Sequence, residues 1–273
     1  MPSSNDCARF PLISVRIVVF LGILAIVSRA NAQDRPFQFS LSAAPRVPPS
    51  PQTRVDYDIG LGEQTFHSDT SNAPEQRIGL QASIGRWTLV GRLGVSMVHE
   101  AYNSSQSGEA LYSISLAASS PVALAIGGGV LHEPNGTNVW LTRVVAAHDA
   151  ERWRLDGNVL LQMPRAVGRD AVDVITTVGW SHRITPAVAL GFEVLGEDVE
   201  GFWNAAEAEG GARLLAGPSL HIRPSGRRWQ ISATGGPTFH PSSSPLISSA
   251  LRTLPARSQG GGYAVRTSFA LSF

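Results

Sequence analysis

The 273-residue chain contains no lysine and one cysteine, and charged residues make up only 16% of it. Disordered chains are rich in charge and poor in apolar residues, so a hydrophobic fraction of 43% argues against disorder. The net charge of +1 gives no general electrostatic reason to expect nucleic acid as a partner. The absence of lysine means that any basic site is built from arginine, whose guanidinium is rigid and always charged.

The first 32 residues have the pattern of a secretory signal peptide. Arg9 and Arg16 precede the apolar run IVVFLGILAIV, and Ala30-Asn31-Ala32 fits the small-x-small cleavage rule. The run is shorter than the roughly twenty residues of a comfortable membrane-spanning helix, although a retained anchor is the alternative. We expect residues 1–32 to be removed together with Cys7, which leaves no disulfide, thiol nucleophile or cysteine–metal site in the mature chain.

No stretch of eighteen apolar residues follows the signal, which excludes a helical membrane protein. Residues 33–51 contain APRVPPSP and predict an extended periplasmic linker or N-terminal plug. From residue 52 to 273, apolar and polar residues alternate with period two, which predicts a single β domain. The expected twelve strands cover 53–64, 75–85, 86–98, 108–119, 121–132, 137–149, 151–163, 170–184, 186–197, 211–223, 227–240 and 260–273.

The connections between these strands alternate between long and short. The expected long connections are 65–74, 99–107, 133–136, 164–169, 198–210 and 241–259. Short periplasmic turns and longer extracellular loops are typical of an outer-membrane barrel. The predicted fold class is therefore all-β, a transmembrane antiparallel up-and-down β-barrel of about twelve strands.

The tryptophans gather near one end of the predicted strands. Trp87, Trp153 and Trp229 each follow an arginine and open a strand after a short turn, and Trp180 closes a strand near the next short turn. With Phe273 they predict an aromatic girdle at one membrane boundary. The alternative is that tryptophan begins the core strands of a soluble sandwich.

One face of most predicted strands is apolar, whereas the other holds mostly glycine, serine, threonine, glutamine or charge. Val172, Val174, Val178 and Trp180 form one such apolar row. In a membrane barrel the apolar row faces lipid and the polar row faces the lumen. We therefore expect apolar residues outside the barrel and polar residues inside it.

The last strand closes the predicted barrel against the first. Its ending, Tyr263 followed by Phe269-Ala270-Leu271-Ser272-Phe273, resembles the C-terminal signature of Gram-negative outer-membrane β-barrel proteins. The match is specific over these last eleven residues and extends to the rest of the chain only as architecture. The resemblance implies location in the bacterial outer membrane, contact with its lipid and lipopolysaccharide, and recognition of the last strand by the barrel-assembly machinery.

The predicted lumen holds the main concentration of charge. The expected inward arginines are Arg54, Arg77, Arg92, Arg143, Arg152, Arg154, Arg213, Arg223 and Arg266. The expected inward acids are Asp56, Asp58, Asp156, Asp173 and Glu193, with His221 and His240. Nine basic residues against five acidic ones favour an aqueous pore that prefers anions. The alternative is a set of arginine–carboxylate ladders that fill a narrow lumen and hold it shut.

Enzyme motifs are incomplete. His132-Glu133-Pro134-Asn135-Gly136 resembles in part the His-x-Ser-Asn-Gly motif of outer-membrane phospholipases, but Pro134 stands where the nucleophilic serine is required. Asn135-Gly136 is better explained as a tight hairpin turn. We expect no catalytic residues and no cofactor, and a lipid-modifying enzyme remains the third alternative after the pore and a closed surface-interaction barrel.

Three further patterns remain open. The acidic segment 196–211 contains Glu197, Asp198, Glu200, Glu207 and Glu209, which suit a hard divalent cation, a gate over the mouth, or a solvated surface loop. Gly127-Gly128-Gly129 predicts a bend or bulge. Pro218 and Pro237 interrupt predicted strands, where we expect bulges or displaced strand ends.

Overall fold

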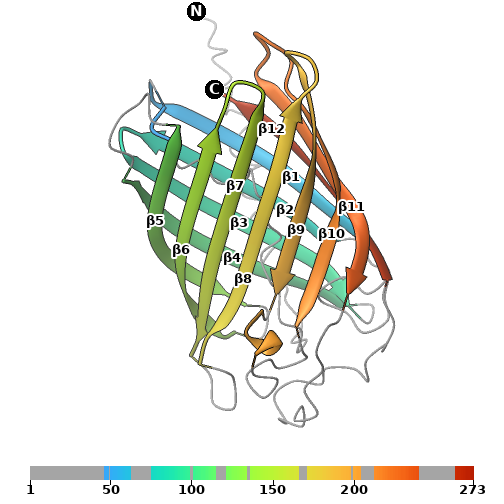
Figure 1. The fold of residues 1–273 in the computed structure, drawn as a ribbon. Helices are drawn as coiled ribbons and strands as arrows, with labels where there is room; N and C mark the ends of the chain where they lie inside the picture. The colour runs from blue at the N-terminus through green and yellow to red at the C-terminus, as the bar shows by residue number, and fades with distance from the viewer. Residues whose placement is uncertain are drawn as a thin grey trace, which may run out of the picture.

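The computed structural model describes residues 46–48, 50–62, 75–98, 101–114, 121–133, 136–165, 171–197, 199–203, 212–239 and 262–273. These residues form a closed antiparallel barrel in which each strand pairs with the next and β1 pairs with β12 (Figure 1). The strands are β1 (Gln52–Gly62), β2 (Glu75–Ile84), β3 (Trp87–Val98), β4 (Ala101–Ser113), β5 (Val122–His132), β6 (Asn138–Asp149), β7 (Trp153–Pro164), β8 (Asp173–Arg183), β9 (Val188–Glu197), β10 (Arg213–Ile222), β11 (Trp229–Phe239) and β12 (Gly262–Ser272). A short 3₁₀ helix, η2 (Val199–Phe202), follows β9.

The strand pattern predicted from the sequence is confirmed, because all twelve strands form and the barrel closes. The strand β4 differs from its expected position at 108–119 and begins at Ala101. Val98 pairs with Ala101, so the expected long connection over 99–107 is wrong and most of it belongs to the sheet. The run Asn103–Gly108 is polar enough to suggest a loop, but pairing with β3 continues through it.

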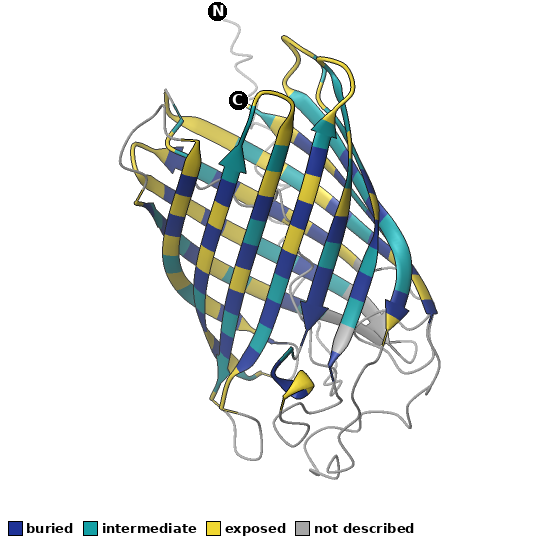
Figure 2. Ribbon diagram, in the orientation of Figure 1, coloured by how far each residue is buried: buried dark blue, intermediate teal, exposed yellow. Residues whose placement is uncertain are grey.

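Burial alternates along the strands, as Figure 2 shows by the regular change of colour on the front strands. On β8, Asp173, Ile175 and Thr177 are buried, whereas Val178 and Trp180 are exposed. Exposed valine, leucine, isoleucine and tryptophan side chains recur on the outer face of most strands. This is the pleat expected when hydrocarbon surrounds the barrel.

The connections at one end of the barrel are tight hairpins. Gly85 in the β2–β3 turn and Gly226 in the β10–β11 turn have positive φ angles of 57° and 72°, which favour glycine. At the opposite end, between β5 and β6, Gly136 has φ 85° and its N–H donates to Glu133 O at 2.9 Å, which agrees with the tight turn expected there. We call the end that holds the β2–β3, β6–β7, β8–β9 and β10–β11 turns the short-turn end; β12 also finishes there (Figure 1).

The prolines lie inside their strands without a bulge. Between β10 and β11, Leu215 pairs with Thr238 and Ser219 pairs with Thr234, so the register is the same on both sides of an unpaired stretch. Pro218 and Pro237 lie on this stretch and pair on their other sides with β9 and β12. The expected bulges are therefore wrong. The prolines, which have no N–H to donate, lie where the pairing between β10 and β11 is interrupted.

The chain crosses the short-turn end before it enters the sheet. Arg46 Nε donates to Asp149 Oδ2 at 2.6 Å, and its Nη2 donates to Pro121 O at 2.9 Å. Asp149 ends β6, whereas β1 begins at Gln52, five strands away around the ring. We call residues 46–48 and 50–51, which belong to the expected linker 33–51, the strap. The strap contains proline and connects the start of β1 to the end of β6 on the other side of the barrel.

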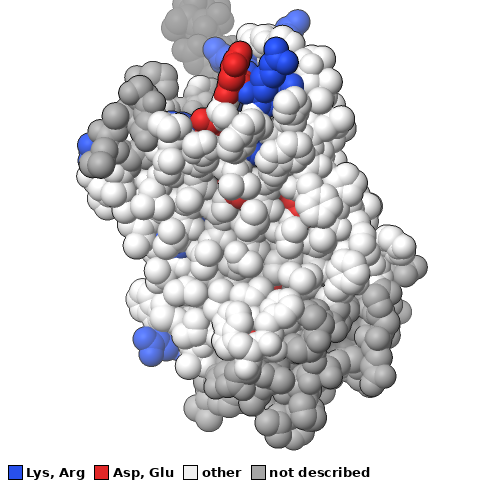
Figure 3. Space-filling view, viewed as in Figure 1, with Lys and Arg blue, Asp and Glu red and all other residues white. Residues whose placement is uncertain are grey.

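The outer surface is poor in charge between the two ends of the barrel. In the view of Figure 3 the middle band is almost free of charged atoms, while blue and red side chains gather at the short-turn end. Among the described residues, no helix has the length and apolarity needed to cross a membrane.

Candidate functional site

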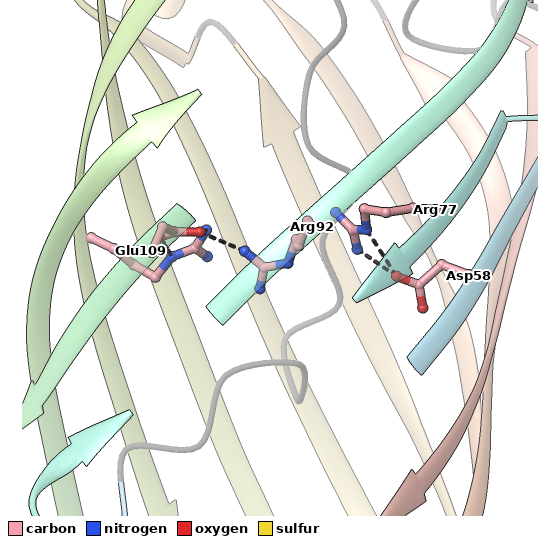
Figure 4. Close-up of polar contacts among 5 residues, drawn as sticks. Asp58, Arg77, Arg92 and Glu109 are labelled. Atoms are coloured by element: carbon pink, nitrogen blue, oxygen red, sulfur yellow. Dashed lines mark hydrogen bonds and ion pairs between the residues drawn. The ribbon is translucent and has the colours of Figure 1, made fainter. Parts of the chain in front are cut away.

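The lumen contains a buried ion pair between β1 and β2. Asp58 and Arg77 are direct cross-strand partners and are 3% and 5% exposed. Arg77 Nη2 and Nε both donate to Asp58 Oδ2, at 2.6 and 3.0 Å (Figure 4). Because both groups are desolvated, each one requires the other.

A second arrangement joins three strands through Glu109. Arg92 Nη1 on β3 donates to Glu109 Oε1 at 2.5 Å (Figure 4). Arg143 on β6 donates from Nε to Glu109 Oε2 at 2.6 Å and from Nη2 to Oε1 at 2.8 Å. One carboxylate therefore holds two arginines, and the whole lumen cluster of Asp58, Arg77, Arg92, Glu109 and Arg143 carries one positive charge in excess.

Glycines on β5 allow Arg143 to reach Glu109 across the intervening strand. Gly127 pairs with Arg143, and Gly129 pairs with Glu109. A Cβ atom on Gly129 would lie 2.1 Å from Gly108 O and 2.8 Å from Glu109 Cγ, so no side chain fits there. Pairing with β4 and β6 is continuous through the three glycines, so they mark a close approach of strands rather than the bulge weighed from the sequence.

A smaller polar group lies toward the short-turn end of β6–β10. Arg154 Nε donates to both oxygens of Asp156, at 2.8 and 2.9 Å, and its Nη1 lies 3.5 Å from Asp149 Oδ1. Glu193 Oε1 lies 3.5 Å from His221 Nε2, and His221 Nδ1 shares a hydrogen bond with Ser232 Oγ at 3.1 Å. These contacts connect the Arg46 strap to the lumen through Asp149 and Arg154.

An apolar band inside the barrel departs from the expected polar lumen. It lies near the ends of the strands opposite the short-turn end, mostly on β5–β10, and its side chains are at most 3% exposed. We define the apolar band as Leu131, Val139, Leu141, Leu160, Ile175, Leu195, Leu215 and Ala264. The expectation of polar residues inside the barrel is therefore wrong at these eight positions.

The remaining inward predictions have mixed outcomes. Asp173, Glu193 and Arg266 are buried, and Asp56 and Arg54 are half-buried with 4.0 Å between Arg54 Nε and Asp56 Oδ1. Arg152 and Arg223 instead lie exposed in short turns, because the strands they were assigned to begin later or end earlier than expected. The side chain of Arg213 and all of His240 lie outside the described residues.

Sequence reasoning missed Glu109, the residue that organises the lumen cluster. It shares the inner face of β4 with Leu111, so that face is not uniformly polar, and β4 begins at Ala101, seven residues before the expected start at 108. Glu197 is also buried. The expected excess of nine arginines over five acids does not hold for the described strands. Six of those arginines point inward there, against seven carboxylates, which are the five expected acids together with Glu109 and Glu197.

The acidic segment after β9 is only partly described. Glu197 and Glu200 are 2% and 7% exposed, and Glu200 Oε2 accepts a hydrogen bond from Val174 N at 3.1 Å. These two carboxylates are therefore not part of a solvated surface. Asp198, Glu207 and Glu209 lie outside the described residues, within which no group of three metal-ligating side chains occurs.

The aromatic residues expected in the girdle lie at the short-turn end. Trp87, Trp153 and Trp180 are 53%, 39% and 46% exposed, Phe273 is exposed, and Trp229 is half-buried. Trp87 contacts Tyr112 edge-to-face at 5.0 Å between ring centroids. His148 and His182 lie 5.0 and 6.2 Å from Trp153 and Trp180, measured between centroids.

Comparison with known proteins relates the chain by fold. No protein-family model matches it, and no curated protein matches it. A solved structure titled "KdgM porin" superposes with a TM-score of 0.54 at 9% identity, covering 81% of this chain and 99% of that one. A "NanC porin" structure superposes with a TM-score of 0.54 at 11% identity, covering 80% and 98%. The chain therefore shares the closed-barrel fold of these porins.

Proposed function

We propose that this protein is an outer-membrane pore for small polar or anionic solutes. The observation that carries the proposal is a closed barrel with an apolar exterior and buried arginines on its inner wall. Outer-membrane pores place charged side chains in the lumen because solutes cross there in water. The similarity to porin folds supports the same function, and a further similar structure is titled "KdgM porin in complex with disordered oligogalacturonate".

The preference for anions rests on the lumen cluster alone, because six arginines and seven carboxylates line the lumen as a whole in the described strands. Arg77, Arg92 and Arg143 face Asp58 and Glu109, which leaves one positive charge where β1–β4 approach β6. Guanidinium groups bind carboxylate and phosphate through two parallel hydrogen bonds. Arg143 Nη1 is buried and makes no hydrogen bond to a described residue, so the positive charge of this guanidinium is only partly compensated by Glu109.

A closed barrel is the second candidate. The ion pairs of the lumen cluster, together with the apolar band, fill much of the interior with side chains that are a few per cent exposed at most. A lumen filled in this way favours a structural or surface-interaction role. A lipid-modifying enzyme has no such support, because His132 is exposed on β5 and the serine of the motif is missing.

Location and assembly form part of the proposal. The apolar exterior supports insertion in the bacterial outer membrane, with lipid and lipopolysaccharide around the barrel. We take residues 1–32 as a cleaved signal and β12, which ends at the girdle, as the strand that the assembly machinery recognises.

Planar-bilayer recording of the purified mature chain tests the pore. We expect stable single-channel currents, with a reversal potential in a KCl gradient that indicates preference for chloride. Arg92→Gln is expected to shift that potential toward potassium, whereas Arg165→Gln, outside the strands, leaves it unchanged. A folded barrel that passes no current would support the closed barrel, and cation preference in the unaltered protein would contradict the role of the lumen cluster.

A further inference from the structure

Exposed arginines surround the short-turn end of the barrel. We define the arginine rim as Arg86, Arg152, Arg183, Arg223, Arg227 and Arg228, all exposed and all at the hairpins of this end. Within these described turns Glu151 is the single exposed acid. The charged side chains at this end of Figure 3 contrast with the uncharged middle band. The rim is therefore a strongly positive surface on an almost neutral protein.

The arginines of the rim differ from those of the lumen in their partners. Arg77, Arg92 and Arg143 each contact a carboxylate. No arginine of the rim forms an ion pair with a side chain in the described part of the chain, although Arg86 Nη1 donates to Tyr112 OH at 3.4 Å. The rim consequently presents guanidinium donors that internal carboxylates do not neutralise.

The rim lies directly beside the aromatic girdle. Arg86, Arg152 and Arg228 each precede a girdle tryptophan in the sequence, and Arg183 ends the strand that carries Trp180. Indole rings on the outer face of a barrel favour the level of lipid head groups. Arginine side chains that begin one residue farther from the hydrocarbon reach the level of the phosphates, with their methylene stems against the apolar surface.

The arginines of the rim are spread around the barrel, which favours many lipid head groups over a single small anion as the ligand. Its arginines come from the β2–β3, β6–β7, β8–β9 and β10–β11 turns, so they surround the barrel instead of converging on one pocket. A single small anion would contact one turn at a time. A layer of lipids around the barrel would contact every turn, and guanidinium binds phosphate through two parallel hydrogen bonds.

We propose that the arginine rim binds the phosphate head groups of anionic phospholipids in the leaflet around the short-turn end. This inference goes beyond the pore and requires only the membrane location proposed above. The lipids hold the barrel at a fixed depth, because the indoles favour the interface and the guanidinium groups favour the phosphates.

Quenching of tryptophan fluorescence by brominated lipids tests the proposal. The mature chain carries Trp140→Phe and Trp203→Phe, so the four remaining tryptophans of the original six, at positions 87, 153, 180 and 229, all report on the short-turn end. It is reconstituted in phosphatidylcholine vesicles that contain either brominated phosphatidylglycerol or brominated phosphatidylcholine. We expect stronger quenching by the glycerol lipid, with relative binding that changes by about fivefold for each arginine at an anionic surface.

Two variants sharpen the measurement. Arg86→Gln, Arg152→Gln and Arg228→Gln together should remove most of the preference for phosphatidylglycerol, and Arg152→Gln alone gives a smaller loss if the triple variant folds poorly. Arg165→Gln is the matched control, because Arg165 is exposed at the opposite end. This control should keep the preference of the parent.

The possible outcomes distinguish a failure of the lipid site from a failure of the proposed membrane location. Equal quenching by both lipids, or a preference that survives the triple substitution, would overturn the lipid site. A preference abolished by inorganic phosphate at constant ionic strength would also overturn it, because the rim would then take free anions. No quenching by either lipid would instead refute the membrane location.

Discussion

The two halves of the barrel wall fill the lumen in different ways. The inner face of β1–β4 carries Asp58, Arg77, Arg92 and Glu109, joined by ion pairs, whereas β5–β10 carry most of the apolar band. Arg143 belongs to β6 yet pairs with Glu109, so it is the charged link between the halves. Burial of a charged side chain is costly unless an opposite charge lies within hydrogen-bonding distance, whereas burial of an aliphatic side chain requires only close packing. The positions of the side chains in the lumen cluster are therefore more tightly constrained than those in the apolar band.

The largest effect is expected from the carboxylate that joins the halves. Glu109→Gln removes the charge between Arg92 and Arg143 and leaves both arginines buried without their counter-ion. Loss of a partner from a buried ion pair costs about 3–5 kcal/mol. Urea unfolding in lipid vesicles should show a loss of this size, with Ser107→Ala on the same strand as control. A loss below about 1 kcal/mol would mean that the pair behaves like an exposed one.

The apolar band should respond to lost volume. Leu160 is fully buried, so Leu160→Ala should leave a cavity and cost about 2–4 kcal/mol in the same unfolding assay. Leu190→Ala is the comparison on the outer face, where lipid fills the vacated space and the loss should be smaller. Equal losses at the two positions would indicate that the apolar band is not packed.

Within the charged half, the two arginines on Glu109 should differ. Arg92 donates one hydrogen bond and its side chain is 7% exposed, whereas Arg143 donates two and its side chain is 1% exposed. Arg92→Gln should cost about 1.5–2 kcal/mol, near the lower end for hydrogen bonds to charged groups, and Arg143→Gln should cost more. The reverse order in urea unfolding would show that Arg92 is the main partner of Glu109.

The smallest effect is expected at the strap. Arg46 and Asp149 have side chains that are 29% and 32% exposed, so Arg46→Gln should change the free energy of unfolding by less than about 1 kcal/mol. The strap itself should become easier to cleave, because its anchor on β6 is lost. Limited proteinase K digestion measures the cleavage rate before residue 52, and a rate equal to that of the unaltered chain would refute the anchor.

The sequence predicts the barrel well because lipid imposes one rule on every strand. Period-two alternation locates β6, β7 and β8 within three residues of their observed ends. It fails for β4, where polar residues continue on the sheet and pairing with β3, rather than composition, determines the strand. The pattern within one short stretch of sequence does not show which other strand it pairs with or how far that pairing extends.

The interior is harder to predict than the exterior. The register indicates that Arg77 and Asp58 point inward, but not that Glu109 holds two arginines from β3 and β6. That contact depends on Gly127 and Gly129, whose missing side chains are visible in the sequence only as a break in the pattern. Likewise, Leu160 and Ile175 occur at positions where the alternation predicts polar residues, and their mutual packing becomes evident only from the folded wall.

The central claim is that the apolar outer face meets hydrocarbon while the inner face does not. Residues 33–273 contain no cysteine, so in a chain of these residues Thr177→Cys and Val178→Cys introduce one thiol each at neighbouring positions of β8. After reconstitution, a spin label at position 178 should be relaxed by oxygen dissolved in the bilayer, and a label at 177 should not. The opposite pattern, with the label at 177 exposed to the lipid phase, would contradict the account.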